Sequence, residues 1–316
     1  MAGKPKLIVI AGPTASGKTA CAVELCRRIG GEVVSADSMQ IYRGMDILSA
    51  MPSMEERGGI PHYMLGIADP VEKYSAATYR DRAEPVIGEI LRRGRQPVIC
   101  GGTGLYIDAL TRPMRFSERS DERMHAELMA MADEPGGKRR LHEMLEQVDP
   151  QSAARLHEND VRRVVRAIEI YRLTGKTQTE QAQQDAAGEG RYDEMIFALE
   201  WPREVLYQRI DRRVDAMLEA GLIEEVSRLH ADSERFPTAA QAIGYKEIAA
   251  ALEGRMSMET AIEKVKQASR NFAKRQMTWF RRDPRTIWIP AQGRTAGELS
   301  GEIQRMWEEN IHGQRS

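Results

Sequence analysis

The first third of the chain alternates short apolar runs with longer stretches of helical periodicity. Leu7–Ala11 is a continuous apolar run, as expected for a strand buried on both faces, and Glu32–Ser35 and Gln96–Cys100 are typical of further short strands. Helical periodicity follows the first strand up to about Ile29 and recurs over Tyr79–Arg93. Strands that alternate with helices predict an α/β fold, with a parallel sheet flanked by helices.

The pattern changes at about Pro113. Residues 113–197 show helical periodicity and no convincing strand before Met195–Leu199, which indicates an all-helical insertion. We therefore assign 1–112 and 198–316 to an α/β core with C-terminal helices, and 113–197 to a helical insertion domain.

Helices are predicted again toward the C-terminus, over about 202–220, 223–230 and 258–280. The stretch 178–190 is polar and rich in glycine and alanine. It is predicted to be a flexible loop.

A phosphate-binding motif joins the first predicted strand to the first helix. Its residues match the pattern G-x-x-x-x-G-K-[ST]: Gly12, Pro13, Thr14, Ala15, Ser16, Gly17, Lys18 and Thr19. The glycines let backbone N–H groups turn toward a diphosphate, Lys18 reaches its terminal phosphate, and the Thr19 hydroxyl can ligate Mg²⁺. The strand before the motif and the helix after it argue against a chance match, so we predict a P-loop NTPase-like core that binds a diphosphate.

Two further polar residues follow predicted strands. Asp37 lies two residues beyond the second strand, and Thr103 lies in the loop Gly101–Gly104 after the third. Because ligands of open α/β sheets bind beyond the carboxyl ends of the strands, both side chains can face the phosphate site. The spacing leaves three roles open for Asp37: a helix cap or turn residue, a partner of Mg²⁺, and a general base.

The composition is that of a globular protein that does not enter membranes. Of 316 residues, 41% are hydrophobic and 29% are charged, and no apolar run approaches the length of a membrane span. The 46 basic residues against 47 acidic ones exclude a uniformly basic nucleic-acid coat, but not a local one. Three cysteines without CxxC spacing argue against disulfides or a zinc site and favour a cytoplasmic protein with reduced, buried thiols: Cys21, Cys26 and Cys100.

Positive charge is concentrated near the C-terminus. Residues 264–285 carry eight basic side chains against Asp283 alone, a net charge of +7. One stripe at helical spacing is predicted to be buried: Val265, Ala268, Phe272 and Trp279. Another stripe is basic: Lys266, Arg270 and Lys274. A solvated face or a membrane-surface helix gives a similar pattern, but the local charge favours a surface that binds a nucleic-acid backbone.

A series of sequence blocks resembles the tRNA dimethylallyltransferases, also called tRNA isopentenyltransferases. The blocks extend over about residues 7–282 in the order of that family, and they are the P-loop, Ser35–Asp46, Gly101–Tyr106, Asn159–Glu169, Gly175–Thr177, Ala242–Glu247 and Ala273–Phe280. A P-loop alone says little about the substrate, whereas this series is specific. The chain resembles the shorter bacterial form, without the zinc finger of eukaryotic members.

The resemblance implies transfer of a dimethylallyl group from dimethylallyl diphosphate to N6 of the adenosine 3′-adjacent to the anticodon, with Mg²⁺ and release of pyrophosphate. It implies that the P-loop holds the prenyl diphosphate and that Asp37 is the general base. It also implies that Arg213, with Thr19 and its Mg²⁺, stabilises the departing pyrophosphate. From the residues alone, Arg213 is better explained as a solvated charge on a helix. The implied partners are the tRNA anticodon stem-loop and dimethylallyl diphosphate, bound by a monomer.

The resemblance further implies tRNA contacts on several segments. They are Asp37, Ser38, Met39 and Gln40; Thr103; Arg162, Arg163, Val164, Val165 and Arg166; and Gln241, Gly244, Tyr245 and Lys246. A family arginine aligns with His125, which implies a weaker or shifted contact there. The loop Ile47–Pro52 lacks the glycine and lysine common in the family, so no cationic contact is expected from it. The arginines of 162–166 suit phosphates, although a solvated helix face would look the same.

Two other classes of protein share part of the pattern. A P-loop small-molecule kinase would have the same phosphate cradle and Mg²⁺ ligand, but it would not account for the basic helix or the arginines of 162–166. A non-catalytic RNA-binding P-loop protein would leave Asp37 without a role. We therefore expect a tRNA dimethylallyltransferase.

Overall fold

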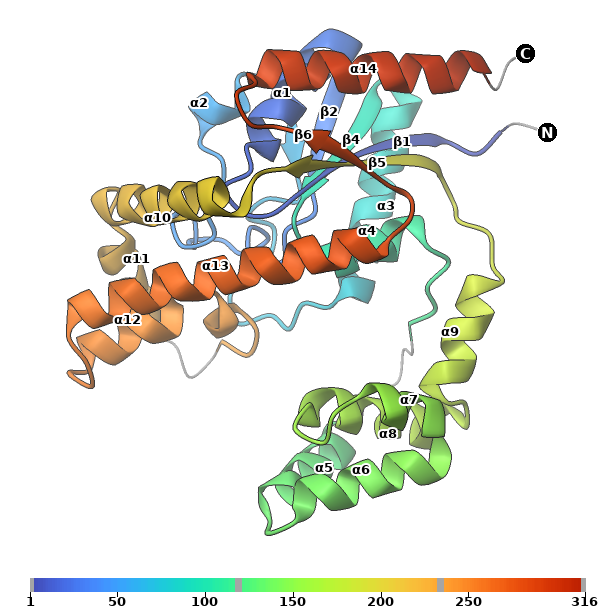
Figure 1. Cartoon of the computed structure of the whole chain (residues 1–316), viewed down its shortest axis with the longest axis vertical. Coiled ribbons are helices and arrows are strands. Elements are labelled where there is room, and N and C mark those ends of the chain that lie inside the picture. Colours follow the sequence, from blue (N-terminus) through green and yellow to red (C-terminus); the bar gives the residue numbers. More distant parts are fainter. Residues whose placement is uncertain (1–2, 117–120, 232–235, 314–316) are drawn as a thin grey trace. The chain divides into compact units, whose positions relative to one another are not determined.

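The chain forms two compact units in the computed structural model, which describes residues 3–116, 121–231 and 236–313. One unit combines residues 1–111 with 192–316, and the other consists of residues 112–191. Figure 1 shows a sheet with helices in the first unit and helices alone in the second. The smaller unit is continuous in sequence and interrupts the larger one.

The larger unit is built on a parallel sheet. Its six strands within the described residues are β1 (Lys6–Ala11), β2 (Gly31–Ser35), β3 (His62–Tyr63), β4 (Gln96–Gly101), β5 (Asp193–Glu200) and β6 (Thr286–Pro290). They lie in the order β3-β2-β4-β1-β5-β6, and every neighbouring pair is parallel. The predicted α/β fold with a parallel sheet is confirmed.

One face of the sheet is covered by α1 (Lys18–Ile29) and α14 (Ala296–Gly313), which lie side by side (Figure 1). Alternate residues of β1, Ile8 and Ile10, belong to the same buried cluster as Leu25 of α1. Residues of neighbouring strands and of α14 complete this cluster. A strand between two helical layers is buried on both sides, which explains its unbroken apolar sequence.

The other face is covered by α3 (Ala76–Arg92) and α4 (Gly104–Thr111) (Figure 1). Tyr79 of α3 is completely buried there, and its hydroxyl donates to the Ser35 carbonyl at the end of β2, over 2.9 Å. This hydrogen bond holds the carboxyl end of β2, two residues before Asp37, against α3.

The remaining helices of the larger unit are α2 (Met54–Arg57), α10 (Arg203–Glu219), α11 (Leu222–His230), α12 (Tyr245–Leu252) and α13 (Met258–Arg282). The structure confirms the three helices predicted over 202–220, 223–230 and 258–280. Within the described part of the chain, no helix combines the length and apolar character needed to cross a membrane. The three cysteines are free and buried, as predicted.

The smaller unit contains α5 (Glu122–Asp133), α6 (Gly137–Val148), α7 (Pro150–Arg155), α8 (Val161–Thr174) and α9 (Gln178–Ala186). Leucines of α5 and α6 and the apolar side of α8 form its core. The loop predicted over 178–190 is wrong for its first half, which is α9. Thr177 and Glu180 form a capping box that satisfies the free N–H groups at the start of this helix.

The boundary between the units differs from the expected one. Residues 192–197 belong to the larger unit, because β5 pairs with β1 from Asp193 opposite Lys6 to Ala198 opposite Ala11. The strand begins with two acidic residues, and this polar start explains why the hydrophobic pattern indicates it only from Met195 onward.

Candidate active site

The P-loop connects β1 to α1 at the carboxyl edge of the sheet. Gly12 and Gly17 have positive φ angles of 148° and 88°, which side chains rarely allow. A Cβ atom at Gly12 would also lie 2.9 Å from Ser16 Oγ. Ala15 adopts the left-handed region too, with φ of 61°. These turns bring the N-terminus of α1, with its partial positive charge, to the edge of a cavity.

Lys18 and Arg213 bring two positive charges to this cavity. Lys18 Nζ donates to the Pro13 carbonyl over 3.2 Å. Burial lowers the pKa of Lys18 and the pKa of Arg213, while the Asp37 carboxylate nearby acts in the opposite direction on both. Two partly desolvated cations that line one cavity favour an anionic ligand.

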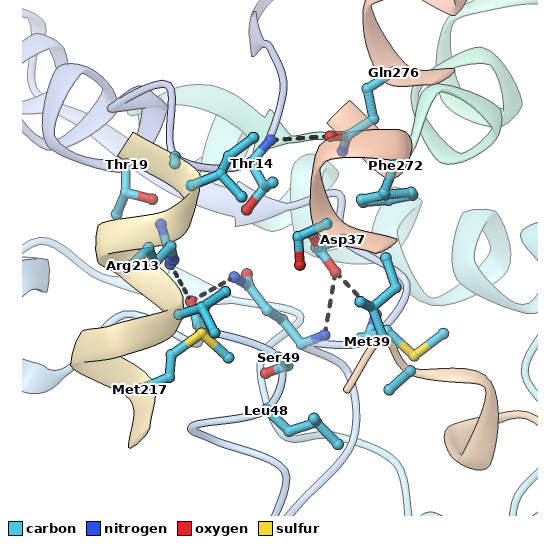
Figure 2. A pocket seen from close by; sticks show the side chains of 18 of the residues that line it. Thr14, Thr19, Asp37, Met39, Leu48, Ser49, Arg213, Met217, Phe272 and Gln276 are labelled. Carbon is cyan, nitrogen blue, oxygen red and sulfur yellow. Dashed lines mark hydrogen bonds between the residues drawn. The ribbon is translucent and has the colours of Figure 1, made fainter. Parts of the chain in front are cut away.

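The two carboxylate oxygens of Asp37 differ in their surroundings. Oδ1 accepts hydrogen bonds from the N–H groups of Met39, at 2.9 Å, and Gln40, at 3.4 Å, as in a turn. Among the described residues, no donor contacts Oδ2. Asp37 lines the same cavity as Lys18 and Arg213 (Figure 2). The side chain can therefore stabilise its own loop and still accept a proton from a ligand.

Thr103 supports the loop that carries Asp37. Its Oγ1 accepts from the Ser38 N–H at 3.0 Å, and its own N–H donates to the Ala36 carbonyl at 3.1 Å. Gly101 permits this approach, because a Cβ there would lie 2.2 Å from the same carbonyl oxygen. Thr103 is not one of the residues that line the cavity. The structure thus places Thr103 beside the loop that carries Asp37. The residues that follow Asp37 and were predicted with it, Ser38, Met39 and Gln40, line the cavity.

The cavity has a volume of about 340 Å³ and a mixed lining (Figure 2). The P-loop, Asp37 and Arg213 make one part of the lining polar. Apolar side chains from several elements supply the rest: Leu48, Ile210, Val214, Met217, Ile243, Val265 and Phe272. Polar groups that converge beside an apolar surface suit a ligand with a charged end and a hydrocarbon end.

Arg213 is oriented by a loop carbonyl. Its Nη2 donates to the Ala50 carbonyl over 3.1 Å, and Gln40 Nε2 donates to the same oxygen at the same distance (Figure 2). The guanidinium is therefore held at the cavity, and the solvated position that its sequence context favoured is wrong.

A buried glutamate holds the loop that contains Ala50. Glu225 of α11 is 3% exposed, and its carboxylate accepts the N–H groups of Ile47, at 3.0 Å, and Leu48, at 2.7 Å. Leu48, Ser49 and Ala50 line the cavity. We define residues 47–51 as the wall loop. Glu225 thus fixes the backbone of this loop, which lacks the glycine and lysine common in the family that the sequence resembles.

The segment 241–246 contributes to the cavity in part. Gln241 lines the cavity, and Lys246 is exposed. Gly244 has φ of 98°, and a Cβ there would lie 3.1 Å from Leu48. Tyr245 is buried, with its hydroxyl 3.2 Å from His230 Nδ1. The Tyr245 side chain thus packs inside the protein, and its expected contact with tRNA stays a prediction.

In the smaller unit, the segment 162–166 divides into exposed and buried residues. Arg162 and Arg163 are exposed, and Arg166 is half-buried. Val164 and Val165 are completely buried in the core of the unit. The helical period turns these two side chains inward, and the contact of this segment with tRNA stays a prediction.

Glu169 connects two of the residues expected to contact tRNA. His125 Nδ1 lies 2.5 Å from one of its carboxylate oxygens, and Arg166 Nη1 lies 3.3 Å from the other. Glu169 is buried, while the His125 side chain is largely exposed. Arg123, near His125 in sequence, pairs with Glu127 at 3.0 Å. His125 and Arg166 therefore share the Glu169 carboxylate in one polar site on this unit.

The basic helix α13 is partly neutralised by its neighbours. Lys266 pairs with Asp215 and Arg270 with Asp211, each at 2.6 Å, so both join α13 to α10. The predicted basic stripe is wrong at these two positions. In the described part of the chain, four basic residues of α13 are exposed and have no ion pair: Lys264, Lys274, Arg275 and Arg282.

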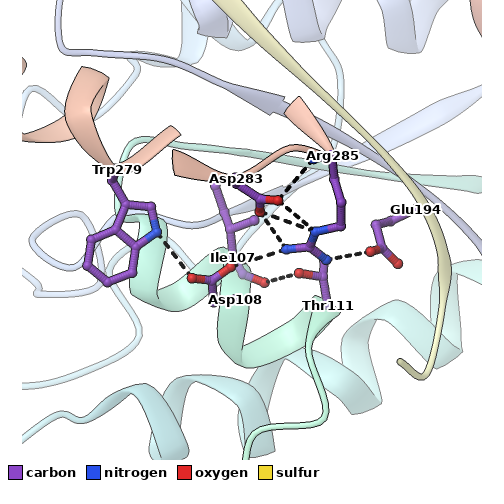
Figure 3. Close-up of polar contacts among 7 residues, drawn as sticks. All are labelled: Ile107, Asp108, Thr111, Glu194, Trp279, Asp283 and Arg285. Atoms are coloured by element: carbon purple, nitrogen blue, oxygen red, sulfur yellow. Dashed lines mark hydrogen bonds and ion pairs between the residues drawn. The ribbon is translucent and has the colours of Figure 1, made fainter. Parts of the chain in front are cut away.

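Arg285, just beyond α13, lies in an acidic cluster (Figure 3). It contacts Asp108 of α4 at 3.3 Å, Glu194 of β5 at 2.5 Å and Asp283 at 2.7 Å. Trp279 donates from Nε1 to Asp108 over 3.1 Å and is 42% exposed, so its assignment to the buried stripe is wrong. Its ring covers Gly104, where a Cβ would lie 2.3 Å away.

Sequence reasoning missed two buried polar residues beside the site, Glu225 and Gln276. Gln276 contacts both the P-loop and the loop after β4. Each is a polar residue within the apolar stripe of a helix, and that exception to the pattern is the signal that could have identified it.

Comparisons with known proteins agree along the chain. Residues 40–283 match the family model of IPP transferase, and residues 5–74 match that of isopentenyl transferase. A tRNA dimethylallyltransferase of Halalkalibacterium halodurans is 46% identical over 287 residues, which cover 90% of this chain and 91% of the relative. One from Exiguobacterium sp. is 48% identical over 298 residues, 94% of each chain.

Solved structures give the same result. A tRNA isopentenylpyrophosphate transferase from Bacillus halodurans superposes with a TM-score of 0.73 and 41% identity, covering 99% of this chain and 100% of its own. A eukaryotic dimethylallyltransferase described as acting on tRNA gives a TM-score of 0.81 at 29% identity, covering 98% of this chain and 80% of its own. With a P-loop and Asp37 at one cavity, and relatives of this identity over nearly the whole chain, the protein belongs to the tRNA dimethylallyltransferase family.

Proposed function

We propose that the protein transfers a dimethylallyl group from dimethylallyl diphosphate to N6 of the adenosine 3′-adjacent to the anticodon of tRNA. The observation that carries this proposal is the single cavity lined by the P-loop, by Asp37 and by apolar side chains. Family membership supports the same reaction, and the polar and apolar parts of the lining match the two ends of a prenyl diphosphate.

In the proposed reaction, the bond between the allylic carbon and the diphosphate oxygen breaks, and a bond from that carbon to N6 forms. Asp37 Oδ2 accepts the proton that N6 loses, and pyrophosphate leaves. Lys18, Arg213 and the N–H groups of the P-loop stabilise the negative charge on the leaving group. The adenine must leave its stack to reach a diphosphate in this cavity, so a flipped base is expected.

Mg²⁺ fits the proposed site through Thr19. The Thr19 hydroxyl lines the cavity beside Lys18. The described residues hold no cluster of three or more histidine, cysteine or acidic side chains, so the ion would take its other ligands from the diphosphate and water, as Mg²⁺ prefers. Bound there, Mg²⁺ would neutralise charge on the leaving pyrophosphate.

The protein would bind the tRNA at its anticodon stem-loop. The exposed arginines Arg162 and Arg163, the His125–Arg166 site and the unpaired cations of α13 are the groups we assign to its phosphates. Ser38, Met39, Gln40 and Gln241 line the cavity and would meet the flipped base. All these groups come from one chain, so we propose a monomer, acting where tRNA is found, in the cytoplasm.

The test supplies the protein with Mg²⁺, unmodified tRNA and labelled dimethylallyl diphosphate, and in parallel with labelled ATP in place of the prenyl donor. Movement of label from the prenyl donor to tRNA is the expected result. Turnover of ATP without prenyl transfer would instead identify a P-loop kinase. Binding of tRNA with neither reaction would identify a non-catalytic RNA-binding protein.

A further inference from the structure

Gln276 is a buried amide in an otherwise apolar stripe of α13. Its side chain is 5% exposed, and its neighbours Ala273, Met277 and Phe280 are buried apolar residues. A buried amide is costly unless both of its ends find partners. At Gln276 both ends do, and both partners belong to loops at the candidate active site.

Each end of the amide makes one hydrogen bond of 2.9 Å. Oε1 accepts from the Thr14 N–H of the P-loop, and Nε2 donates to the Gly102 carbonyl in the loop after β4 (Figure 2 shows the first of these). A carboxamide can accept from an N–H and donate to a carbonyl at the same time without carrying a charge.

Gly102 provides the space for this contact. A Cβ atom there would lie 2.1 Å from Gln276 Nε2 and 3.1 Å from the Gly12 carbonyl oxygen. The helix, the P-loop and the loop after β4 therefore meet at one point, where a larger residue would separate them.

The hydrogen bond to Thr14 fixes one peptide plane of the phosphate cradle. The Thr14 N–H and the Pro13 carbonyl belong to the same planar peptide and point in opposite directions. While Gln276 holds the N–H, the carbonyl stays toward Lys18 Nζ, at 3.2 Å, and the Ser16 N–H, at 3.3 Å. The orientation of this peptide thus sets the position of the Lys18 ammonium.

The hydrogen bond to the Gly102 carbonyl connects Gln276, through Thr103, to the loop that carries Asp37. Gly102 precedes Thr103, which binds the Ser38 N–H next to Asp37. We propose that Gln276 is a positioning residue, whose amide fixes the phosphate cradle relative to the Asp37 base. This inference rests on the proposed function, because alignment of these two groups matters only if a diphosphate and a proton-losing substrate meet between them.

The test compares three variants. Gln276→Met keeps the length of the side chain and removes both hydrogen bonds. Gln276→Glu keeps an acceptor for Thr14, but when ionised it cannot donate to the Gly102 carbonyl. Gln267→Met is the matched control, because Gln267 lies on the same helix, is exposed and forms hydrogen bonds only within that helix, with Asn271 and Arg270, among the described residues.

For Gln276→Met we expect kcat to fall by about 10- to 100-fold, since a misplacement on the scale of 1 Å costs rates of this order. The KM for dimethylallyl diphosphate and the Kd for Mg²⁺-pyrophosphate should rise, while the Kd for tRNA stays within about twofold. Gln267→Met should match the unmodified protein in every measurement. A kcat and a pyrophosphate Kd within twofold of the unmodified protein, with only Tm lowered, would overturn the inference.

Gln276→Glu gives an independent readout through pH. A protonated carboxyl donates and accepts as the amide does, and burial favours the protonated form. We expect the kcat/KM of this variant, relative to the unmodified protein, to rise as the pH is lowered. A flat ratio contradicts the positioning role, and this measurement decides alone if Gln276→Met fails to fold.

The inference and the proposed function fail in different ways. If the unmodified protein transfers no prenyl group to tRNA, the proposed function is wrong, and the pyrophosphate titration alone decides whether Gln276 shapes the cradle. If transfer occurs and Gln276→Met leaves it unchanged, the proposed function stands and the positioning role is wrong.

Discussion

At the scale of single residues, the geometry of Asp37 is compatible with two of the roles that the sequence left as alternatives, a turn residue and a general base. One carboxylate oxygen caps the turn at Met39 and Gln40, and the other has no donor among the described residues. Asp37 can therefore keep its loop in place through Oδ1 while Oδ2 is available to accept a proton.

Asp37→Asn tests the base. The amide keeps an oxygen for the Met39 and Gln40 N–H groups but cannot accept a proton from N6, so kcat should fall by about 10²- to 10⁴-fold. Steady-state kinetics and tRNA binding check this expectation, with tRNA affinity and Tm close to those of the unmodified protein. A kcat reduced by less than about tenfold would leave Asp37 only its turn-capping role.

Lys18→Met separates function from stability. Because burial lowers the pKa of Lys18, its charged form is less favourable in the folded chain than in the unfolded one at pH 7. Since the unfolded chain binds the proton more tightly, this site's contribution to stability rises as the pH rises from the folded to the unfolded pKa. Lys18→Met should therefore keep or raise the Tm without ligand, yet lose the increase in Tm that Mg²⁺-pyrophosphate gives the unmodified protein. A clearly lower Tm without ligand would contradict this account.

The sequence identified the residues whose chemistry is local, and it missed those that act through distant backbone atoms. The P-loop and Asp37 were predictable because strand, loop and helix follow each other directly. Gln276 and Glu225 were not, because their partners lie 262 and 177 positions away in the chain and are backbone N–H groups, which all residue types except proline carry.

At the scale of elements, the wall loop depends on α11. Its two buried N–H groups at Ile47 and Leu48 are satisfied by the carboxylate of Glu225, and its Ala50 carbonyl holds Arg213. One short helix therefore controls both an apolar wall of the cavity and the orientation of a cation.

Glu225→Gln should destabilise the wall loop. The amide can accept from one N–H but places its own NH₂ group near the other, which costs about 1–3 kcal/mol of unfolding free energy. The KM for dimethylallyl diphosphate should rise as well, because Leu48 and Ala50 line the cavity. Denaturant titration and kinetics measure both effects, with Glu224→Gln, at the exposed neighbouring position, as the control. If the two variants had the same unfolding free energy and the same KM, Glu225 would not support the wall loop.

Elements with strong apolar runs were predictable, and those defined by capping or by tertiary contact were not. β1, β4 and α13 match their predicted ranges closely. β3 has only two residues and does not stand out as a run, while β5 was predicted only from Met195 onward because it starts with acidic residues. α9 forms in a polar stretch because of its capping box, which local propensity alone did not indicate.

At the scale of the whole molecule, the nearly equal numbers of basic and acidic residues make the chain almost neutral, and ion pairs between them neutralise many charges locally. The net charge is −1, and several cations that appear free in the sequence, among them Lys266 and Arg270, are bound to carboxylates. The cations left exposed on α8 and α13 are the ones available to a polyanion.

Arg163→Ala should weaken tRNA binding through charge alone. Arg163 is exposed and lies 3.8 Å from Asp160, so its loss should lower the slope of log affinity against log salt by about one and leave pyrophosphate binding unchanged. Arg172→Ala, at an exposed position later on the same helix, is the control. A salt slope equal to that of the unmodified protein would remove Arg163 from the phosphate contacts.

The Arg285 cluster has a consequence for how the two units are joined. Asp108 lies one turn before the chain leaves the larger unit at Thr111, and Glu194 lies just after it returns at Tyr192. A single guanidinium therefore holds the exit and the re-entry of the chain close together. We expect that residues 112–191 can be excised and replaced by a short glycine linker, giving a minimal core that melts cooperatively and binds Mg²⁺-pyrophosphate but binds tRNA more weakly, because the cations of α8 are lost while those of α13 remain. Calorimetry and filter binding would measure this separation, and an excised chain that fails to fold would show that the larger unit depends on the helical unit for its stability.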